Sequence, residues 1–128
     1  MNYSKYRFTL DIHKTKSDVS IPVLLWDTSI RFYISLNDGG TPYKITAGCT
    51  AKLACRKSSG NSFLQDCEID DNRIVYTFDQ NTADELGVAI CEVRLYHPSG
   101  GTLTTPRFFI NVEEKVVSDE EIEAYREE

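Results

Sequence analysis

The chain has 128 residues, of which 41% are hydrophobic and 27% charged, and its formal net charge is −6 at pH 7. This length suits one domain with a proper core, and the composition excludes a disordered or fibrous chain. No apolar run reaches the ~20 residues that a membrane helix needs. Residues 1–7 lack the apolar core of a secretion signal. We therefore expect neither a membrane span nor export by a signal peptide.

The negative charge is concentrated at one end of the chain. Residues 113–128 contain eight acidic and two basic residues, whereas residues 1–112 contain twelve of each. No basic segment of the kind that binds nucleic acid occurs in either part. We therefore predict no nucleic-acid partner.

Alternating apolar and polar residues predict seven or eight short β-strands. The strands are expected at residues 6–12, 21–25, 30–36, 49–56, 63–69, 74–78, 89–95 and 103–112. Clusters of glycine, proline, asparagine, aspartate and serine between them are typical of turns. One helical turn is expected at residues 79–86.

The connections favour antiparallel pairing. Parallel neighbours would need a crossover, usually a helix of ten or more residues, and no such segment separates the strands. The economical fold for residues 1–115 is an all-β, antiparallel β-sandwich with immunoglobulin-like or Greek-key connections.

Residues 116–128 have a different pattern, which predicts the start of a C-terminal helix or helical linker. Ser118 and Glu121 have the spacing of a capping box, and Val117 and Ile122 stand at the positions of a hydrophobic staple. Acidic residues at 119–121 favour the positive end of the helix dipole. Because a helix this short is marginal in isolation, we expect it to pack on a neighbour or to continue in a longer polypeptide.

The cysteines lack the spacing of a zinc site, since the chain has no C-x-x-C pair and only two histidines. Cys49, Cys55 and Cys91 share the strand parity of apolar neighbours. Such a pattern ordinarily indicates that the cysteines are small thiols buried in the core. The fourth cysteine is Cys67.

The sequence assigns no catalytic, cofactor-binding or metal-binding residue, and it predicts a protein that is not an enzyme. Motifs for a serine nucleophile, a phosphate loop, a dinucleotide or a metalloprotease zinc are missing. His13 and His97 lie next to turns, where we expect them at the surface. The carboxylates at 70–71 are typical of a β-turn, and those at 113–114 point to opposite faces of a strand.

Four aromatic residues offer an alternative function. Trp26, Tyr33, Tyr43 and Tyr96 could form a platform on which sugars stack, and Tyr33 and Tyr96 fall on the polar parity of their strands. Aromatic side chains of this kind are also common where one protein contacts another. A carbohydrate- or cell-surface-binding module is therefore an alternative to a protein-binding module.

Several segments taken in order resemble a known family. They are KTKSD at 14–18, DTSIRF at 27–32, LNDGGTPYKIT at 36–46, KSSG at 57–60, CEVRLY at 91–96 and LTTPRFFINVE at 103–113. Their succession over residues 5–114 is similar to the N-terminal domain of the phage baseplate upper protein (BppU) family. One departure is Trp26, which stands where the family often has glycine.

The resemblance implies a structural β-sandwich in the virion, on the tail baseplate of a phage or prophage, assembled in the bacterial cytoplasm. It implies that the domain anchors receptor-binding components to the tail hub. The implied partners are other tail and baseplate proteins, with neither nucleic acid nor membrane. A homo-oligomer, a trimer by this resemblance, would form through downstream parts.

Overall fold

The computed structural model describes residues 2–116, which form ten β-strands and no helix. No segment of this part is therefore a helix that could cross a membrane. The strands are β1 (Ser4–Asp11), β2 (Lys16–Leu24), β3 (Ile30–Asp38), β4 (Thr41–Pro42), β5 (Thr50–Arg56), β6 (Ser62–Asp70), β7 (Arg73–Thr77), β8 (Gly87–Tyr96), β9 (Thr102–Thr104) and β10 (Arg107–Glu113).

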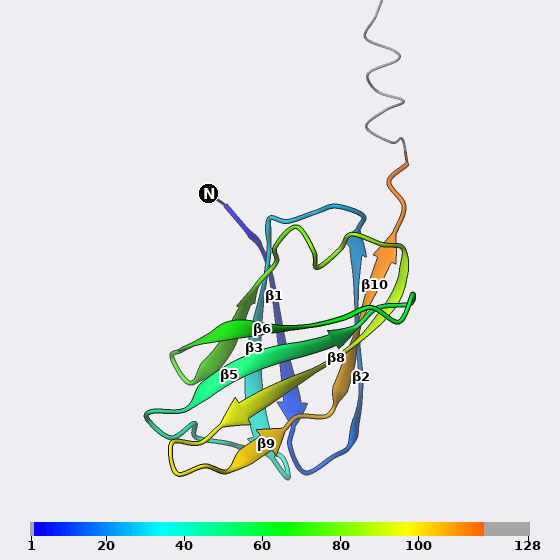
Figure 1. Cartoon of the computed structure of the whole chain (residues 1–128). Helices are drawn as coiled ribbons and strands as arrows, with labels where there is room; N and C mark the ends of the chain where they lie inside the picture. The colour runs from blue at the N-terminus through cyan, green and yellow to red at the C-terminus, as the bar shows by residue number, and fades with distance from the viewer. Residues whose placement is uncertain (1, 117–128) are drawn as a thin grey trace, which may run out of the picture.

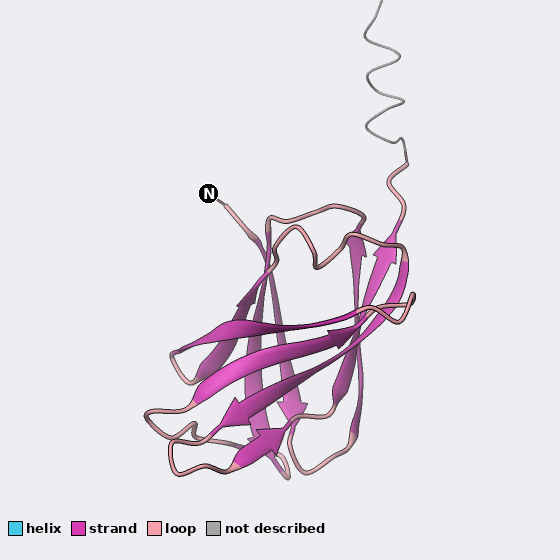
Figure 2. Ribbon diagram, in the orientation of Figure 1, coloured by secondary structure: helices cyan, strands magenta, loops and turns pink. Residues whose placement is uncertain are grey.

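The strands lie on one hydrogen-bonded path that folds over on itself (Figures 1 and 2). Its order is β1-β3-β7-β6-β5-β8-β10-β2, with β4 beside β3 and β9 beside β8. Strand β6 joins the two layers, since residues 62–67 pair with β5 and residues 68–70 with β7. Figure 1 shows β5, β6 and β8 crossing in front of β1 and β3. The result is a flattened, nearly closed barrel.

The all-β prediction is confirmed, but the prediction of purely antiparallel pairing is wrong at both ends of the path. Strand β1 pairs with β3 in parallel, and β10 pairs with β2 in parallel. No helix is needed between β1 and β3, because β2 lies in the other layer and returns the chain to the start of β3. The expected sandwich with immunoglobulin-like connections is not confirmed, since the path is continuous. The helix predicted within residues 116–128 lies outside the described residues, apart from Val116.

The segment between β7 and β8 does not form the expected helical turn. The side chain of Asp79 accepts a hydrogen bond from the amide of Asn81 (2.8 Å), and the hydroxyl of Thr82 accepts one from the amide of Asp79 (3.1 Å). Such local bonds from side chain to backbone compete with helix formation. Thr82 is buried, so its hydroxyl holds this loop against the core.

The core is made by inward-facing residues of both layers, with Phe32 at its centre. The Phe32 ring has no exposed surface and packs edge-to-face on Phe8 and Phe78, at centroid distances of 5.5 and 5.1 Å. Cys55 and Cys91 lie opposite each other in β5 and β8, and both are buried free thiols. The predicted burial of cysteine is confirmed for these two, whereas Cys49 is half-buried.

Candidate interaction surfaces

The histidines and cysteines are not brought together into a site. His13 is exposed in the β1–β2 turn, 3.8 Å from the carboxylate of Asp38. His97 lies in the β8–β9 turn, where its Nδ1 is 2.6 Å from the hydroxyl of Ser99. Within residues 2–116 no three His, Cys, Asp or Glu side chains are grouped so that they could hold a metal ion.

The acidic turn after β6 has a structural role. Asp71 and Asn72 form the two-residue β6–β7 loop, and their φ angles of 51° and 58° are those of a type I′ turn. The Asn72 side chain accepts a hydrogen bond from the amide of Ile45 (2.8 Å) and donates one to the carbonyl of Tyr43 (3.1 Å). The prediction of a turn at 70–72 is confirmed.

The four aromatic residues proposed as a sugar platform are dispersed. Trp26 is exposed in the β2–β3 loop, Tyr33 lies on β3, Tyr43 follows β4 and Tyr96 ends β8. Among residues 2–116, no ring contact joins any two of them. A stacking platform is therefore not assembled from these side chains.

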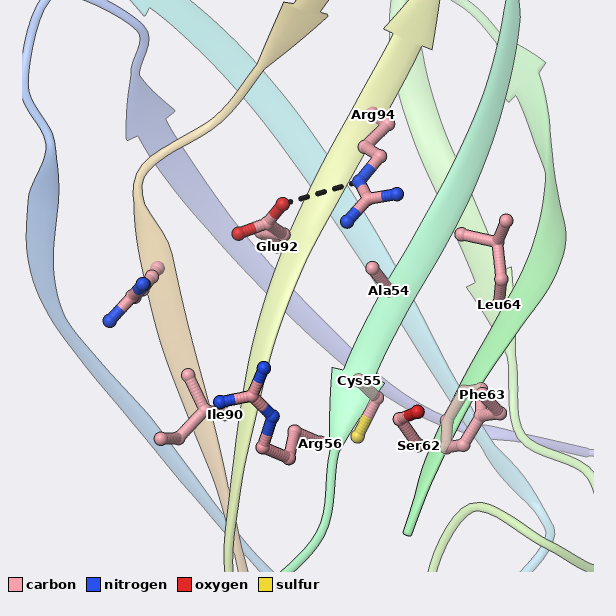
Figure 3. Close-up of a pocket in the computed structure, with 10 residues that line it drawn as sticks. Ala54, Cys55, Arg56, Ser62, Phe63, Leu64, Ile90, Glu92 and Arg94 are labelled. Carbon is pink, nitrogen blue, oxygen red and sulfur yellow. Dashed lines mark hydrogen bonds and ion pairs between the residues drawn. The ribbon is translucent and has the colours of Figure 1, made fainter. Parts of the chain in front are cut away.

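An open groove with a cavity volume of about 360 Å³ crosses the outward face of β5, β6 and β8 (Figure 3). Its apolar lining includes Ala54, Leu64 and Ile90, together with Cys55 and Phe63. Leu64 and Ala54 are cross-strand partners, and Ile90 is the partner of Arg56 on the next row of the sheet. Leu64 is 47% exposed and Ile90 37% exposed. An apolar patch on an outward sheet face is typical of a protein-binding surface.

The rim of the groove is basic. It contains Arg56, Arg94 and Arg107, and Glu92 is the acidic residue among the lining side chains. The Nε atom of Arg94 lies 3.3 Å from the Glu92 carboxylate, a bond drawn in Figure 3. Three arginines and one glutamate leave the rim with a net charge of +2. Arginine around an apolar centre is characteristic of protein interfaces.

A second surface lies on the outward face of β1, β3 and β7. Strand register places Lys5 beside Arg31, and Arg7 beside Tyr33. Arg73 approaches from β7, with its guanidinium carbon 4.7 Å from the centroid of the Tyr33 ring. We call these five residues the basic tyrosine face.

The cations of this face affect the pKa of Tyr33. A hydrogen bond from Arg31 lowers the pKa of Tyr33 below its ordinary value, and the nearby charges of Lys5, Arg31 and Arg73 lower it further. The guanidinium of Arg7 lies 5.6 Å from the ring centroid and the ammonium of Lys5 lies 6.0 Å from it. These are distances at which cations are attracted to an aromatic ring.

Sequence reasoning missed both surfaces for different reasons. In β8, Ala89 and Cys91 face the core, so Ile90 between them faces outward. An apolar residue at this outward position was a signal from which the groove could have been predicted. The basic tyrosine face has no local signal, because its residues come from three strands that only the register places together.

Comparisons with known proteins agree with this fold. The N-terminal domain of phage TP901-1 ORF48 is similar, with a TM-score of 0.66 and 13% sequence identity over 85% of this chain and 98% of that chain. Murine CRIg matches with a TM-score of 0.37 and 14% identity, over 78% of this chain and 95% of its own. The first likeness concerns the fold alone, and the second is too weak to carry an argument. No curated protein matches this chain.

A family model described as the BppU N-terminal domain matches residues 4–128. The match includes every segment on which the sequence resemblance was based, from 14–18 through 103–113. The predicted resemblance is thus confirmed by a comparison that covers nearly the whole chain. The chain belongs to the family of BppU N-terminal domains.

Proposed function

We propose that this domain is a protein-binding module of a phage or prophage tail baseplate, which anchors receptor-binding components to the tail hub through the β5–β6–β8 groove. Membership of the BppU family supports a structural role in the baseplate and a location in the virion tail. It also supports a non-enzymatic role. The neighbour in the groove is another tail or baseplate protein.

The observation that carries the proposal is the exposure of Leu64 and Ile90 on the outward sheet face. Leaving large apolar side chains in water is unfavourable, and their burial against a partner contributes about 25 cal/mol per Å² before the costs of association. The +2 rim selects a partner whose matching surface is acidic. Charges at a rim mainly set the rate and specificity of association.

The test uses purified tail particles from a phage whose copy of this protein carries Leu64→Asp together with Ile90→Asp. A buried carboxylate without a partner is costly, so we expect incorporation into tails to fall by about tenfold or more. Quantitative mass spectrometry of the particles measures it. The matched control is Leu86→Asp, since Leu86 is 41% exposed but does not line the groove.

Normal incorporation of the double variant, with an unchanged melting temperature, would overturn the role of the groove. Loss of incorporation by the Leu86→Asp control as well would mean that any exposed apolar change disturbs assembly. A salt series adds a second readout, because association guided by the arginine rim should weaken as ionic strength rises.

Two finer features of the proposal depend on the family resemblance. Residues 116–128 are proposed to begin a helical segment through which the protein forms a homo-oligomer, a trimer by that resemblance. Assembly is proposed to occur in the bacterial cytoplasm. Light scattering over a concentration series measures the oligomeric state, and a monomer at all concentrations would contradict the trimer.

A further inference from the structure

Two buried thiols face each other in the sheet beneath the groove. In the register of β5 and β8, Cys55 is the direct cross-strand partner of Cys91. Both are free cysteines, and both side chains are buried. The other cysteines are placed differently, since Cys67 stands opposite Ala51 and Cys49 precedes β5. Strand pairing thus brings one particular pair of thiols together.

Backbone hydrogen bonds show which kind of cross-strand pair this is. The amide of Lys57, two residues after Cys55, donates across the β5–β6 hairpin (2.7 Å). The carbonyl of Val93, two residues after Cys91, accepts from the amide of Thr105 on the opposite side of β8 from β5 (2.9 Å). Because backbone groups alternate in direction along a strand, those of the two cysteines point away from each other. The cysteines are therefore a non-hydrogen-bonded pair.

This kind of pair has the spacing that a disulfide requires. The Cα atoms of a non-hydrogen-bonded antiparallel pair lie about 4.5 Å apart, closer than the about 5.5 Å of a hydrogen-bonded pair. Disulfides join residues whose Cα atoms are about 4.4–6.8 Å apart. The side chains of Cys55 and Cys91 both point into the core, so they lie on the same face of the sheet. A bond between them needs no change of strand register.

We propose that Cys55 and Cys91 are a site of reversible oxidation, at which a small-molecule disulfide converts the two thiols into a cross-strand disulfide. The Cys55 thiolate attacks one sulfur of the small disulfide, forms a mixed disulfide and releases a thiolate. Cys91 then attacks the Cys55 sulfur and releases the second thiolate. The protein loses two electrons and two protons, and the small disulfide takes them up to become two thiols.

The surroundings of the two thiols set the order of these steps. Cys55 lines the groove, which gives a small disulfide a route to its sulfur. A hydrogen bond from Cys91 lowers the pKa of Cys55, and the charge of Lys57 lowers it further. The same hydrogen bond, together with burial, raises the pKa of Cys91. Because the thiolate is the nucleophile, Cys55 reacts first and Cys91 resolves the mixed disulfide.

The bond would lie directly beneath the groove. The chain neighbours of the two cysteines, Ala54, Arg56, Ile90 and Glu92, all line it. A cross-link between β5 and β8 would restrict local opening of these strands and so fix the floor of the groove. This consequence for binding rests on the proposed function, whereas formation of the bond depends only on the geometry of the pair.

Equilibration of the full chain with mixtures of reduced and oxidised glutathione tests the site. We expect a monomeric product lighter by about 2 Da, whose peptide map joins Cys55 to Cys91. Its equilibrium constant should be at least about tenfold larger in the folded protein than in urea, because folding holds the two thiols together. An equal or smaller constant in the folded protein, or bonds to Cys49 or Cys67 instead, would overturn the proposal.

Two variants check the roles of the thiols. Cys91→Ala should stop at the mixed disulfide of Cys55 with glutathione, and the matched control, Cys49→Ala with Cys67→Ala, should form the cross-strand bond as before. Loss of the bond in that control, with the domain still folded, would contradict the assignment. The glutathione titration needs no substitution, so it decides the question even if a variant does not fold.

Hydrogen exchange tests the effect on the groove separately. Oxidation should slow amide exchange in β5 and β8 by about tenfold or more and leave β1 and β3, in the other layer, unchanged. Unaltered exchange in β5 and β8 would overturn the restriction of the groove floor. Neither result depends on a partner protein, so failure of the groove as a binding surface would show only in the incorporation of the Leu64→Asp, Ile90→Asp variant.

Discussion

The hydroxyl of Tyr76 lies 2.7 Å from the hydroxyl of Thr82, and both side chains are almost completely buried. The Tyr76 hydroxyl also donates to the side-chain oxygen of Gln65 (3.1 Å), and Gln65 bonds in turn to Asp79. This network joins β7, β6 and the loop before β8. It replaces the helical turn that the sequence predicted at 79–86.

Replacing Tyr76 with Phe should therefore reduce the stability of the domain. The change removes the hydrogen bonds of the Tyr76 hydroxyl to Thr82 and Gln65, at about 0.5–1.5 kcal/mol each. Urea unfolding followed by tryptophan fluorescence gives the free energy of unfolding. Tyr43→Phe is the control, because the Tyr43 hydroxyl makes no hydrogen bond within residues 2–116, and a change within ~0.5 kcal/mol is expected there. Equal effects of the two substitutions would contradict the network.

Arg31→Gln should raise the pKa of Tyr33. The hydrogen bond from Arg31 is the largest cause of the lowered pKa of Tyr33, so its loss should return the value toward the ordinary ~10. A pH titration of ¹³C-labelled tyrosine by NMR resolves this group. Arg56→Gln, on the other layer, should leave the titration of Tyr33 unchanged. An unaltered Tyr33 pKa in the Arg31 variant would contradict this arrangement of charges.

Cys67 should react slowly with iodoacetamide in the folded protein. Burial raises its pKa to about 12, so only about one molecule in 10⁴ carries a thiolate at pH 8. An unperturbed thiol of pKa ~8.5 is about one quarter thiolate at that pH, so we expect a rate about a thousandfold lower than in the unfolded chain. Mass spectrometry after timed quenching measures the rate, and the same chain in urea is the control. Labelling at the unfolded rate would contradict the burial of this thiol.

Asp11 should make the domain sensitive to acid. Its carboxylate accepts hydrogen bonds of 2.9 Å from the amides of His13, Gly39 and Gly40, and these bonds lower its pKa below 3.8. The two glycines have φ angles of +61° and +88°, a conformation that favours glycine and that directs their amides at the carboxylate.

The sign of the pH dependence follows from the lowered pKa. The stabilisation by Asp11 is complete above the unfolded pKa of ~3.9 and is lost as the pH falls through the folded pKa. Asp11→Asn should lower the melting temperature at pH 7, and the difference from the unchanged protein should shrink near pH 2. The control is Asp18→Asn, because Asp18 is an exposed residue of β2. A difference that stays constant with pH would contradict the role of the charge.

Local patterns predicted those features that depend on neighbours in the chain. The alternation at 6–12 corresponds to β1, and that at 89–95 to β8, because the side-chain period of a strand is present in any six or seven residues. The turn at 71–72 follows from the preference of Asp and Asn for positive φ. Strand β2 begins at Lys16, earlier than expected, since its first residues gain their partners only from distant β10.

The alternation of apolar and polar residues was enough to predict the all-β class, and the succession of segments from 14–18 to 103–113 was enough to predict the family. Strand parity also predicted the burial of Cys55 and Cys91, because it assigns each side chain to one face of its strand. Which faces become neighbours depends instead on how the strands pair. The parallel β1–β3 pair places Lys5 and Arg7 beside Arg31 and Tyr33, although more than twenty residues separate them in the chain. The pairing of β6 with β5, and of β5 with β8, likewise assembles the groove. Strand order and register follow from long-range packing of the core, which no short window of sequence contains.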